Sequence, residues 1–434
     1  LFTGTPPYVW ISNQAGNNGV LFGDLNVRAV KDKNDNIISD GRPSLGFTGN
    51  MDTYKPAEGS ATRSDIAITD PDFKYPSLWK SNIAADYKFG DGWVATVELL
   101  YSKDINAIYH DNIGLYRTEQ FVNDGGAGNA RPYYNGYYSD REGNQKAANH
   151  VVMLRNTSKG HSLYTTFQLQ KNFVDGILKG LYLNGSYSFG QSRGVTDGTS
   201  SVATSAWKYR AALDGNAEEV GYTAGSFDGR LLLSASYTAN WSKYAATSFG
   251  LIYQRYRPFR YSYCYNGDAN GDSQFSNDLM YIPANFDEVK DHLLPGDFDS
   301  QEDAWKAMNA FIEQDPYLSK HRGEYAERNG AVAPFANQLD LSVSHDIKIY
   351  QKNGRSHTLR FSFNIANFLN LLNRNWGVVQ TTVLGNQQYQ FLTIPKGQGP
   401  SAANNYTLKY TMAKDLDETF KDNLNDVSRW QMQF

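Results

Sequence analysis

Apolar and polar residues alternate along several stretches of the chain with a period of two. Between residues 231 and 241 the odd positions are apolar, whereas most even positions carry Ser, Thr or Asn. The same alternation is present over 81–89, 181–189, 339–344 and 359–366. Because successive side chains of a β-strand point to opposite faces, each stretch predicts a strand with one apolar and one polar face. The pattern therefore predicts an all-β protein.

Short and long connections alternate between these predicted strands. The short connections lie near Gly90-Asp91-Gly92, Val174-Asp175-Gly176, Ser242-Lys243 and Asn353-Gly354, where Gly and Asn permit the positive φ of tight hairpins. The long, polar connections cover residues 113–149, 193–227, 264–335 and 414–425. Outer-membrane barrels have short periplasmic turns and long extracellular loops. We therefore predict an antiparallel transmembrane β-barrel whose long loops face outwards.

The alternation of connections assigns a direction to each strand, and about 11 strands result. The strands that run towards the short turns or the C-terminus are expected at 81–89, 150–173, 228–241, 336–350, 375–395 and 427–434. The strands that run towards the long loops are expected at 93–112, 177–192, 244–263, 357–369 and 403–412. Trp93 and Tyr101 share one face and suit the two aromatic girdles of a membrane barrel.

The long loop 264–335 departs from the strand pattern. Ser300 and Asp303 form a capping pair, and the apolar residues that follow recur at helical spacing, which predicts a helix over about 301–314 within a helical insertion near 300–328. This insertion is either a lid that faces a ligand or a helix that packs its apolar stripe on the barrel mouth.

The start of the same loop is rich in carboxylate and amide oxygens. Asp268, Asn270 and Asp272 occupy alternate positions, as hard cations such as Ca²⁺ prefer. Ser273 and Leu279 stand where an EF-hand has its Gly and its bidentate Glu, so the segment is not an EF-hand. These three residues are candidate calcium ligands, and a polar turn without metal is the alternative.

Composition narrows the class of protein. The 434 residues contain 41 Lys and Arg against 45 Asp and Glu, and this near-neutral charge argues against a nucleic-acid partner. Stretches of about 20 apolar residues, which a spanning helix needs, do not occur. The seven histidines show no H-E-x-x-H spacing, and neither a P-loop nor a G-x-S-x-G motif is present, so we do not expect an enzyme.

Tyrosine and arginine are concentrated in two segments that the predicted topology places at the extracellular rim. Because Tyr and Arg dominate recognition surfaces, these residues are candidate ligand contacts, with anchoring of the strand ends as the alternative. The candidates are Tyr133, Tyr134 and Tyr137 in the first segment and Arg255, Tyr256, Arg257 and Arg260 in the second.

Three runs of sequence resemble the C-terminal barrel of TonB-dependent outer-membrane receptors, and more closely the Oar-like receptors of Bacteroidota that carry a carboxypeptidase-regulatory-like domain. The runs are NGDANGDSQFSNDLMYIP at 266–283, FIEQDPYLSKHRGEYAERNGA at 311–331 and RFSFNIANFLNLLNRNWG at 360–377. The opening LFTGTPPYVWISN at 1–13 and the closing DVSRWQMQF at 426–434 are also similar to that group.

The resemblance implies a barrel of about 22 strands closed around an N-terminal plug, energised by the TonB complex and used for uptake of a peptide, glycan or metal chelate. Residues 1–434 would then be the C-terminal part of such a barrel in the outer membrane of a bacterium, with the plug and the first barrel half outside this sequence. A half barrel alone would leave two unpaired strand edges in lipid, so we expect it to function only within the parent protein.

Two other interpretations remain open from the sequence alone. A secreted all-β protein would use the 61 aromatic residues to stack on glycans, and its apolar strand faces would meet in a shared core. A passive porin or adhesin barrel would share the strand pattern but would lack a plug.

Overall fold

The structure, a computed structural model, describes residues 30–31, 37–39, 65–126, 130–137, 150–198, 200–350, 356–385 and 388–434. The expected turn at Asn353-Gly354 and the opening segment 1–13 lie outside the described residues. Two short strands near the N-terminus, β1 (Val30–Lys31) and β2 (Ile37–Ser39), pair with each other.

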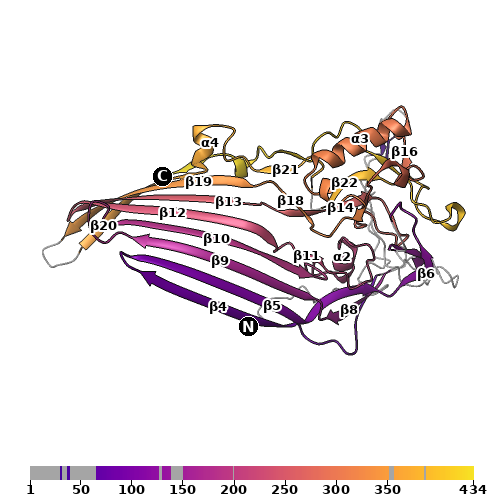
Figure 1. Ribbon diagram of the computed structural model, residues 1–434, viewed down its shortest axis with the longest axis horizontal. Helices are drawn as coiled ribbons and strands as arrows, with labels where there is room; N and C mark the ends of the chain where they lie inside the picture. The colour runs from indigo at the N-terminus through magenta and orange to yellow at the C-terminus, as the bar shows by residue number, and fades with distance from the viewer. Residues whose placement is uncertain are drawn as a thin grey trace.

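A twelve-stranded sheet is the largest sheet among the described residues (Figure 1). Its long strands are arranged as four antiparallel hairpins, β4 (Ser77–Phe89) with β5 (Trp93–Asn112), β9 (Gly160–Asn172) with β10 (Leu181–Gly194), β12 (Phe227–Ser242) with β13 (Ala245–Tyr256), and β19 (Ala336–Tyr350) with β20 (Ser356–Ala366). Neighbouring hairpins pair through β5 with β9, β10 with β12, and β13 with β19. Short strands complete the sheet: β25 (Gln431–Gln433) on β20, β11 (Gly221–Tyr222) on β10, β8 (Val151–Thr157) on the C-terminal part of β5, and β3 (Ile66–Thr69) on β8.

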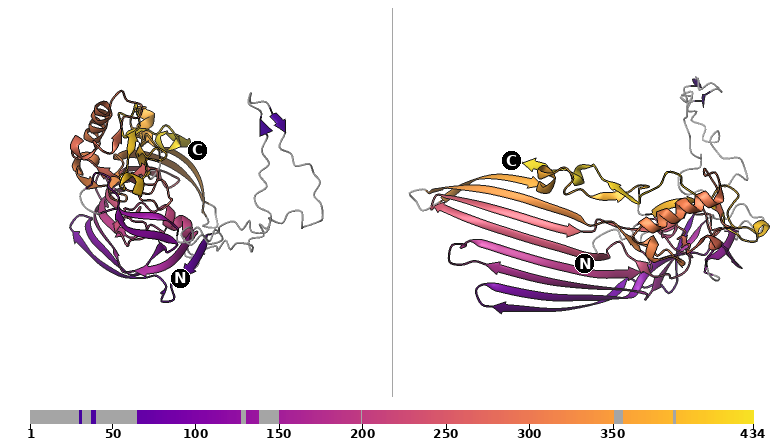
Figure 2. Two further views of the ribbon diagram at one scale, coloured as in Figure 1. Left: turned by 90° about the vertical axis from the view of Figure 1, so that its right-hand side faces the viewer. Right: turned by 45° about the horizontal axis from the view of Figure 1, so that its top comes forward.

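The turns of the first three hairpins gather at one end of the sheet, and the loops that follow β5, β10 and β13 gather at the other (Figures 1 and 2). Asp91 and Gly92 both have positive φ, of 54° and 79°, as the tight turn between β4 and β5 requires. A Cβ on Gly92 would lie 2.4 Å from the carbonyl oxygen of Asn172, so the neighbouring strand also excludes a side chain there. The expected alternation of short and long connections is confirmed for the first three hairpins, whose turns the structure describes.

The two faces of the sheet differ as the alternation predicts. One face carries exposed apolar side chains, such as Leu233 at 43% and Phe361 at 58% of full exposure. The other face carries hydrogen-bonded pairs between strands, including Asn82 with Glu98 at 2.8 Å and Gln168 with Asn184 at 2.7 Å. Among the described residues no second sheet covers the apolar face.

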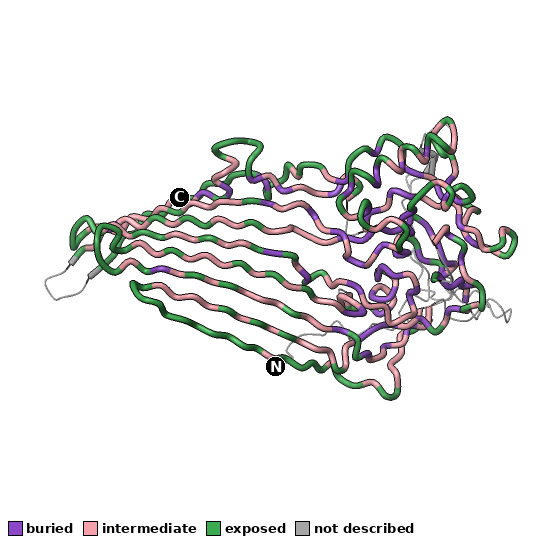
Figure 3. The backbone as a smooth tube through the Cα atoms, viewed as in Figure 1, coloured by how far each residue is buried: buried purple, intermediate pink, exposed green. Residues whose placement is uncertain are grey.

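The main hydrophobic core lies in the loops (Figure 3). The loops fold together into a body that we call the cap, residues 113–126, 130–137, 195–226 without 199, 257–335, and 378–425 without 386–387. A five-stranded sheet runs through it, in the order β16 (Leu293–Leu294), β23 (Tyr410–Met412), β22 (Gln388–Thr393), β14 (Arg260–Asn266) and β18 (Ala331–Val332). Its largest helix is α3 (Gln301–Gln314), which begins at the predicted Ser300 cap.

Smaller elements complete the loops and the C-terminal segment. The strands are β6 (Leu115–Phe121) paired with β7 (Pro132–Tyr137), β15 (Tyr281–Ile282) with β17 (Glu324–Tyr325), and β21 (Gln380–Thr382) with β24 (Phe420–Asp422). The helices are α2 (Ala203–Lys208) and α4 (Phe368–Leu372), with 3₁₀ turns η2 (Phe286–Glu288), η3 (Leu318–Lys320), η4 (Ala402–Asn404) and η5 (Asp426–Ser428). No helix in these described segments is both long and apolar enough to cross a membrane.

Several expected strands need correction. The expected strands 375–395 and 403–412 do not join the large sheet, because β21, β22 and β23 in these segments pair within the cap. The expected strand 150–173 divides into β8 and β9, and the expected strand 244–263 divides into β13 and β14. Pro258 lies at the second division, where its missing N–H cannot contribute to a central ladder.

The fold is all-β and its large sheet is antiparallel through every long strand. Strands β5 and β19 begin and end at the predicted residues. Within the described residues, β4 and β25 at the two sides of the sheet do not pair with each other, so the sheet remains open there.

Candidate functional site

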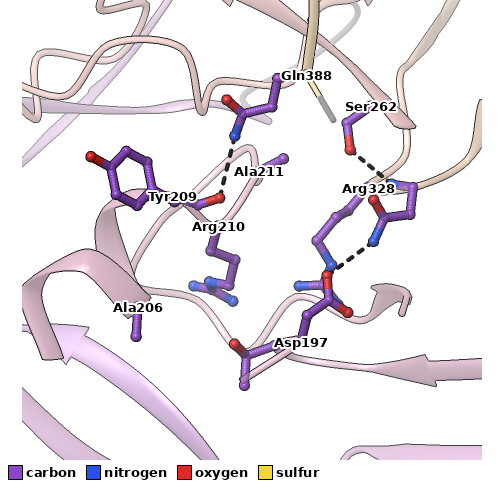
Figure 4. A pocket seen from close by; sticks show the side chains of 10 residues that line it. Asp197, Ala206, Tyr209, Arg210, Ala211, Ser262, Arg328 and Gln388 are labelled. Carbon is purple, nitrogen blue, oxygen red and sulfur yellow. Dashed lines mark hydrogen bonds between the residues drawn. The ribbon is translucent and has the colours of Figure 1, made fainter. Parts of the chain in front are cut away.

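A polar recess of about 340 Å³ lies in the cap, just beyond the C-terminal end of β10. Its walls come from segments far apart in sequence: the stretch after β10, the stretch around α2, strand β14, the turn after β17, and β22 (Figure 4). The volume lies in the range of pockets for small ligands. We therefore take this recess as the candidate ligand site.

Two buried arginines define the chemistry of the recess. Arg210 follows α2 and donates to the carbonyl oxygens of Val195 at 3.2 Å and Ala217 at 2.9 Å, and also to that of Gly215. Arg328 follows β17 and donates to the carbonyl oxygens of Val195 and Gly194. No ion pair joins either guanidinium to a carboxylate in the part of the chain that the structure describes. Backbone carbonyl dipoles therefore provide the direct contacts, and the more distant charges of Glu219, Asp214 and Asp197 also favour the two cations.

The local backbone holds Arg328 in place. Asn329 adopts a left-handed conformation with φ of 51°, which Asn tolerates better than most residues. Its side-chain amide donates to Asp197 at 3.1 Å and to the carbonyl oxygen of Tyr222 at 2.9 Å, and its backbone N–H donates to Ser262 Oγ at 2.8 Å. The turn is thus tied to β14 and to the segment after β10.

Burial lowers the pKa of both arginines. Burial, followed by the charge of Arg328, lowers the pKa of Arg210 to about 10, and burial also lowers the pKa of Arg328. Asp197 and Gln388 add one carboxylate and one amide to the wall. Such a wall can bind a polar ligand through charge and hydrogen bonds.

The three candidate tyrosines lie on β7 inside the cap, where each has an internal partner. Tyr133 packs against the Tyr406 ring at 4.9 Å, the Tyr134 hydroxyl donates to Asp214 at 2.6 Å, and the Tyr137 ring meets the His150 ring edge to face. All three side chains are buried. They present little surface to a ligand in this conformation, and a binding role for them stays a prediction.

The second candidate group lies at the junction of β13 and β14. The guanidinium carbons of Arg255 and Arg257 lie 4.3 and 4.2 Å from the ring centre of Phe335. Arg260 donates to the carbonyl oxygens of Ser226 and Asn329, both at 2.9 Å. The Tyr256 hydroxyl donates to Gln338 at 3.2 Å. Arg255 is exposed, so within this group it is the residue most available to a partner.

The candidate calcium ligands lie in a turn that satisfies its own oxygens. Asp268 accepts hydrogen bonds from the backbone N–H groups of Gly271 at 2.6 Å and Ser273 at 2.8 Å, and Asp272 accepts one from Gln274 at 2.8 Å. Asn270 Oδ1 accepts the N–H of Asp272. Across the described residues, no three His, Cys, Asp or Glu side chains are arranged to hold a metal ion. Calcium at this turn stays a prediction from sequence.

Sequence reasoning did not single out Arg210 or Arg328, because an isolated Arg in a polar loop is usually solvated. Arg328 does fall within the run 311–331 that carries the resemblance. Arg210 has no comparable signal, since its burial depends on the packing of the 195–221 segment around it. The recess is therefore a product of the folded loops.

No protein-family profile matches the chain, and no curated protein is significantly similar to it. Among solved structures, the chain is weakly similar to the FrpB iron transporter from Neisseria meningitidis (F3-3 variant), with 9% identity and a TM-score of 0.21. The match covers 72% of this chain and 38% of the transporter chain, so the chain spans well under half the length of that structure. A similarity this weak supports no argument about the function of the chain.

Proposed function

We propose that this chain is the C-terminal part of a TonB-dependent transporter in the outer membrane of a bacterium, and that it serves the energised uptake of a ligand such as a peptide, glycan or metal chelate. It acts by gated passage and not by bond chemistry. The observation that carries the proposal is the apolar face of the large sheet, which is exposed across all four hairpins.

The exposed apolar side chains of this face support a membrane location. Leu99 on β5, Phe167 on β9, Leu251 on β13 and Leu359 on β20 are exposed on it. Monomeric soluble proteins rarely expose large contiguous apolar patches, whereas a membrane barrel turns such a band towards lipid. The hydrogen-bonded polar pairs on the opposite face suit the inner wall of a barrel.

The edges of the sheet support the proposal that more strands complete the barrel. In the described residues, β4 pairs along one edge only, with β5. Unpaired backbone groups at a sheet edge cost several kcal/mol each in lipid. We propose that the first half of the barrel in the parent protein pairs with β4, and that a plug and a TonB-contacting segment precede it.

The cap and its recess suit ligand capture. The loops form one packed body at one end of the sheet, and the recess lies where this body meets β10. On this proposal the recess with Arg210 and Arg328 binds polar groups of the ligand before it passes inward.

The membrane location can be tested with introduced cysteines, because the native Cys264 is fully buried. Leu233→Cys and Phe361→Cys lie on the apolar face, and their neighbours Ser234→Cys and Ser362→Cys lie on the polar face. Each variant is labelled with a fluorescent maleimide in vesicles that contain brominated lipid. We expect quenching at 233 and 361 and much weaker quenching at 234 and 362.

Equal quenching at all four positions, or none, would contradict the membrane orientation. The transport part is tested separately on the complete parent protein. A plug domain upstream and a closed conductance in a planar bilayer are expected, whereas a permanently open channel without a plug would identify a passive porin.

A further inference from the structure

The apolar face of the sheet is not smooth but carries a groove of about 430 Å³. Gly185 on β10 lies within it, flanked in register by Leu169 on β9 and Leu233 on β12. Because Gly185 has no side chain, the surrounding leucines rise above it. Most of the groove lining is apolar, from Trp93 on β5 to Leu339 on β19.

The strand register gives the groove a direction. It begins at Trp93, the first residue of β5 beside the tight turn. It ends at Tyr253 and Leu339, which are paired with each other near the end of β13 and the start of β19. The groove therefore rises obliquely from the turn end of the sheet towards the loop end.

A positive charge lies at the loop end of this groove. Arg255 lies two residues beyond Tyr253 on the same face, where it pairs in register with Asn337. Its side chain is exposed, and the described residues provide it with no ion-pair partner. Arg257 lies against the same Phe335 ring, and Asp228 is 3.6 Å from its Nε.

We propose that the groove and Arg255 together form a specific binding site for a membrane lipid with an anionic phosphate headgroup. The acyl chain lies in the groove over Gly185, and the phosphate accepts hydrogen bonds from Arg255, with Arg257 beside it. This inference rests on the proposed function, because it requires the apolar face to contact the bilayer.

Two physical arguments select a lipid as the occupant. An unfilled hollow on an apolar surface forfeits dispersion contacts that a flexible acyl chain can supply. An exposed guanidinium next to such a hollow matches the phosphate of a lipid headgroup, because Arg donates two parallel hydrogen bonds to phosphate. The groove and the cation are continuous on one face, so one amphipathic molecule can occupy both.

The test measures lipid retention by the full chain in non-ionic detergent with native mass spectrometry. The probes have identical acyl chains: phosphatidylglycerol, whose headgroup has a net negative charge, and phosphatidylcholine, whose phosphate charge is offset by the choline ammonium group. We expect preferential retention of phosphatidylglycerol, reduced about tenfold in Arg255→Glu, as loss of a charge-assisted hydrogen bond predicts. Gly185→Leu, which fills the groove, is expected to reduce retention of both lipids. Arg374→Glu, which changes an exposed arginine after α4, is the matched control and should retain the wild-type preference.

Equal retention of the two lipids, or an unchanged preference in Arg255→Glu, would overturn the proposal. Retention that falls in Arg255→Glu but not in Gly185→Leu would also overturn it, because that result describes a site for the phosphate alone. If Gly185→Leu does not fold, Leu169→Trp narrows the same groove from its rim. The fluorescence quenching experiment reports the bilayer contact independently, so failure of the lipid site is distinguishable from failure of the proposed function.

Discussion

Arg131 connects two parts of the cap that are 147 residues apart in sequence. Its guanidinium pairs with Asp124 and Asp278, both at 3.1 Å, and the rings of Tyr265 and Tyr325 flank it at 5.6 and 5.8 Å. All three charged side chains are buried. The sequence shows Arg131 only as the start of a Tyr-rich segment, because the partners that bury it come from other loops.

Removal of Arg131 should strongly destabilise the cap. Arg131→Leu leaves Asp124 and Asp278 buried without a cation, and breaking a buried ion pair in this way costs about 3–5 kcal/mol. The free energy of unfolding, followed by tryptophan fluorescence in urea and detergent, measures the effect. Lys290→Ala breaks the exposed pair with Asp287 and should cost less than about 1 kcal/mol. Similar losses in the two variants would refute a central role for Arg131.

The helix α3 shows how far an element can be predicted from its own residues. Ser300 accepts the N–H of Asp303 at 3.1 Å, and the helix occupies the predicted residues 301–314. Ala304, Met308, Phe311 and Ile312 form the buried stripe. Capping and helical spacing are local, so the sequence is sufficient to predict them. The residues that the stripe packs against are distant in sequence: Phe311 contacts Tyr389 and Phe391 of β22.

Truncation of this stripe should destabilise the cap while the large sheet persists. Phe311→Ala removes a fully buried ring and should cost about 3–5 kcal/mol of cap stability. Hydrogen exchange resolves the two parts, and faster exchange is expected at β14 and β22 but not at β12 and β13. Lys306→Ala on the exposed side of α3 should change stability by less than about 0.5 kcal/mol. Uniformly faster exchange would show that cap and sheet unfold as one unit.

The strand predictions succeeded where a strand has one apolar and one polar face, as in β5, β12 and β19. They were wrong in 375–395 and 403–412, where short strands alternate buried apolar residues with half-buried polar ones but pair within the cap. In β22 the buried Tyr389 and Phe391 alternate with half-buried Gln388 and Gln390, which is the same local pattern as in the large sheet. Period-two alternation therefore identifies the sheet but does not separate it from a folded loop body.

On the scale of the whole molecule, apolar surface is divided between a buried core in the cap and an exposed band on the sheet (Figure 3). The cap satisfies its apolar residues internally, as a soluble domain does. The band on the sheet has no protein cover among the described residues. The surface of the cap is therefore suited to water, whereas the apolar band of the sheet is suited to lipid or detergent.

This division predicts that the chain needs detergent or lipid to remain monomeric. In buffer alone, the exposed band and the open strand edges should drive self-association, and detergent should reverse it. Sedimentation velocity with and without non-ionic detergent measures the outcome. A stable, folded monomer in plain buffer would contradict both the membrane location and the proposed uptake function.

The sequence by itself determined the strand periodicity, the alternation of tight turns and long loops, and the position of α3, because each depends on residues close together in the chain. Only the tertiary structure decided that the long loops form one packed cap, that Arg131, Arg210 and Arg328 are buried in it, and that a groove crosses the sheet at Gly185. These features depend on contacts between residues that lie far apart in sequence, and a single sequence does not specify which distant partners meet.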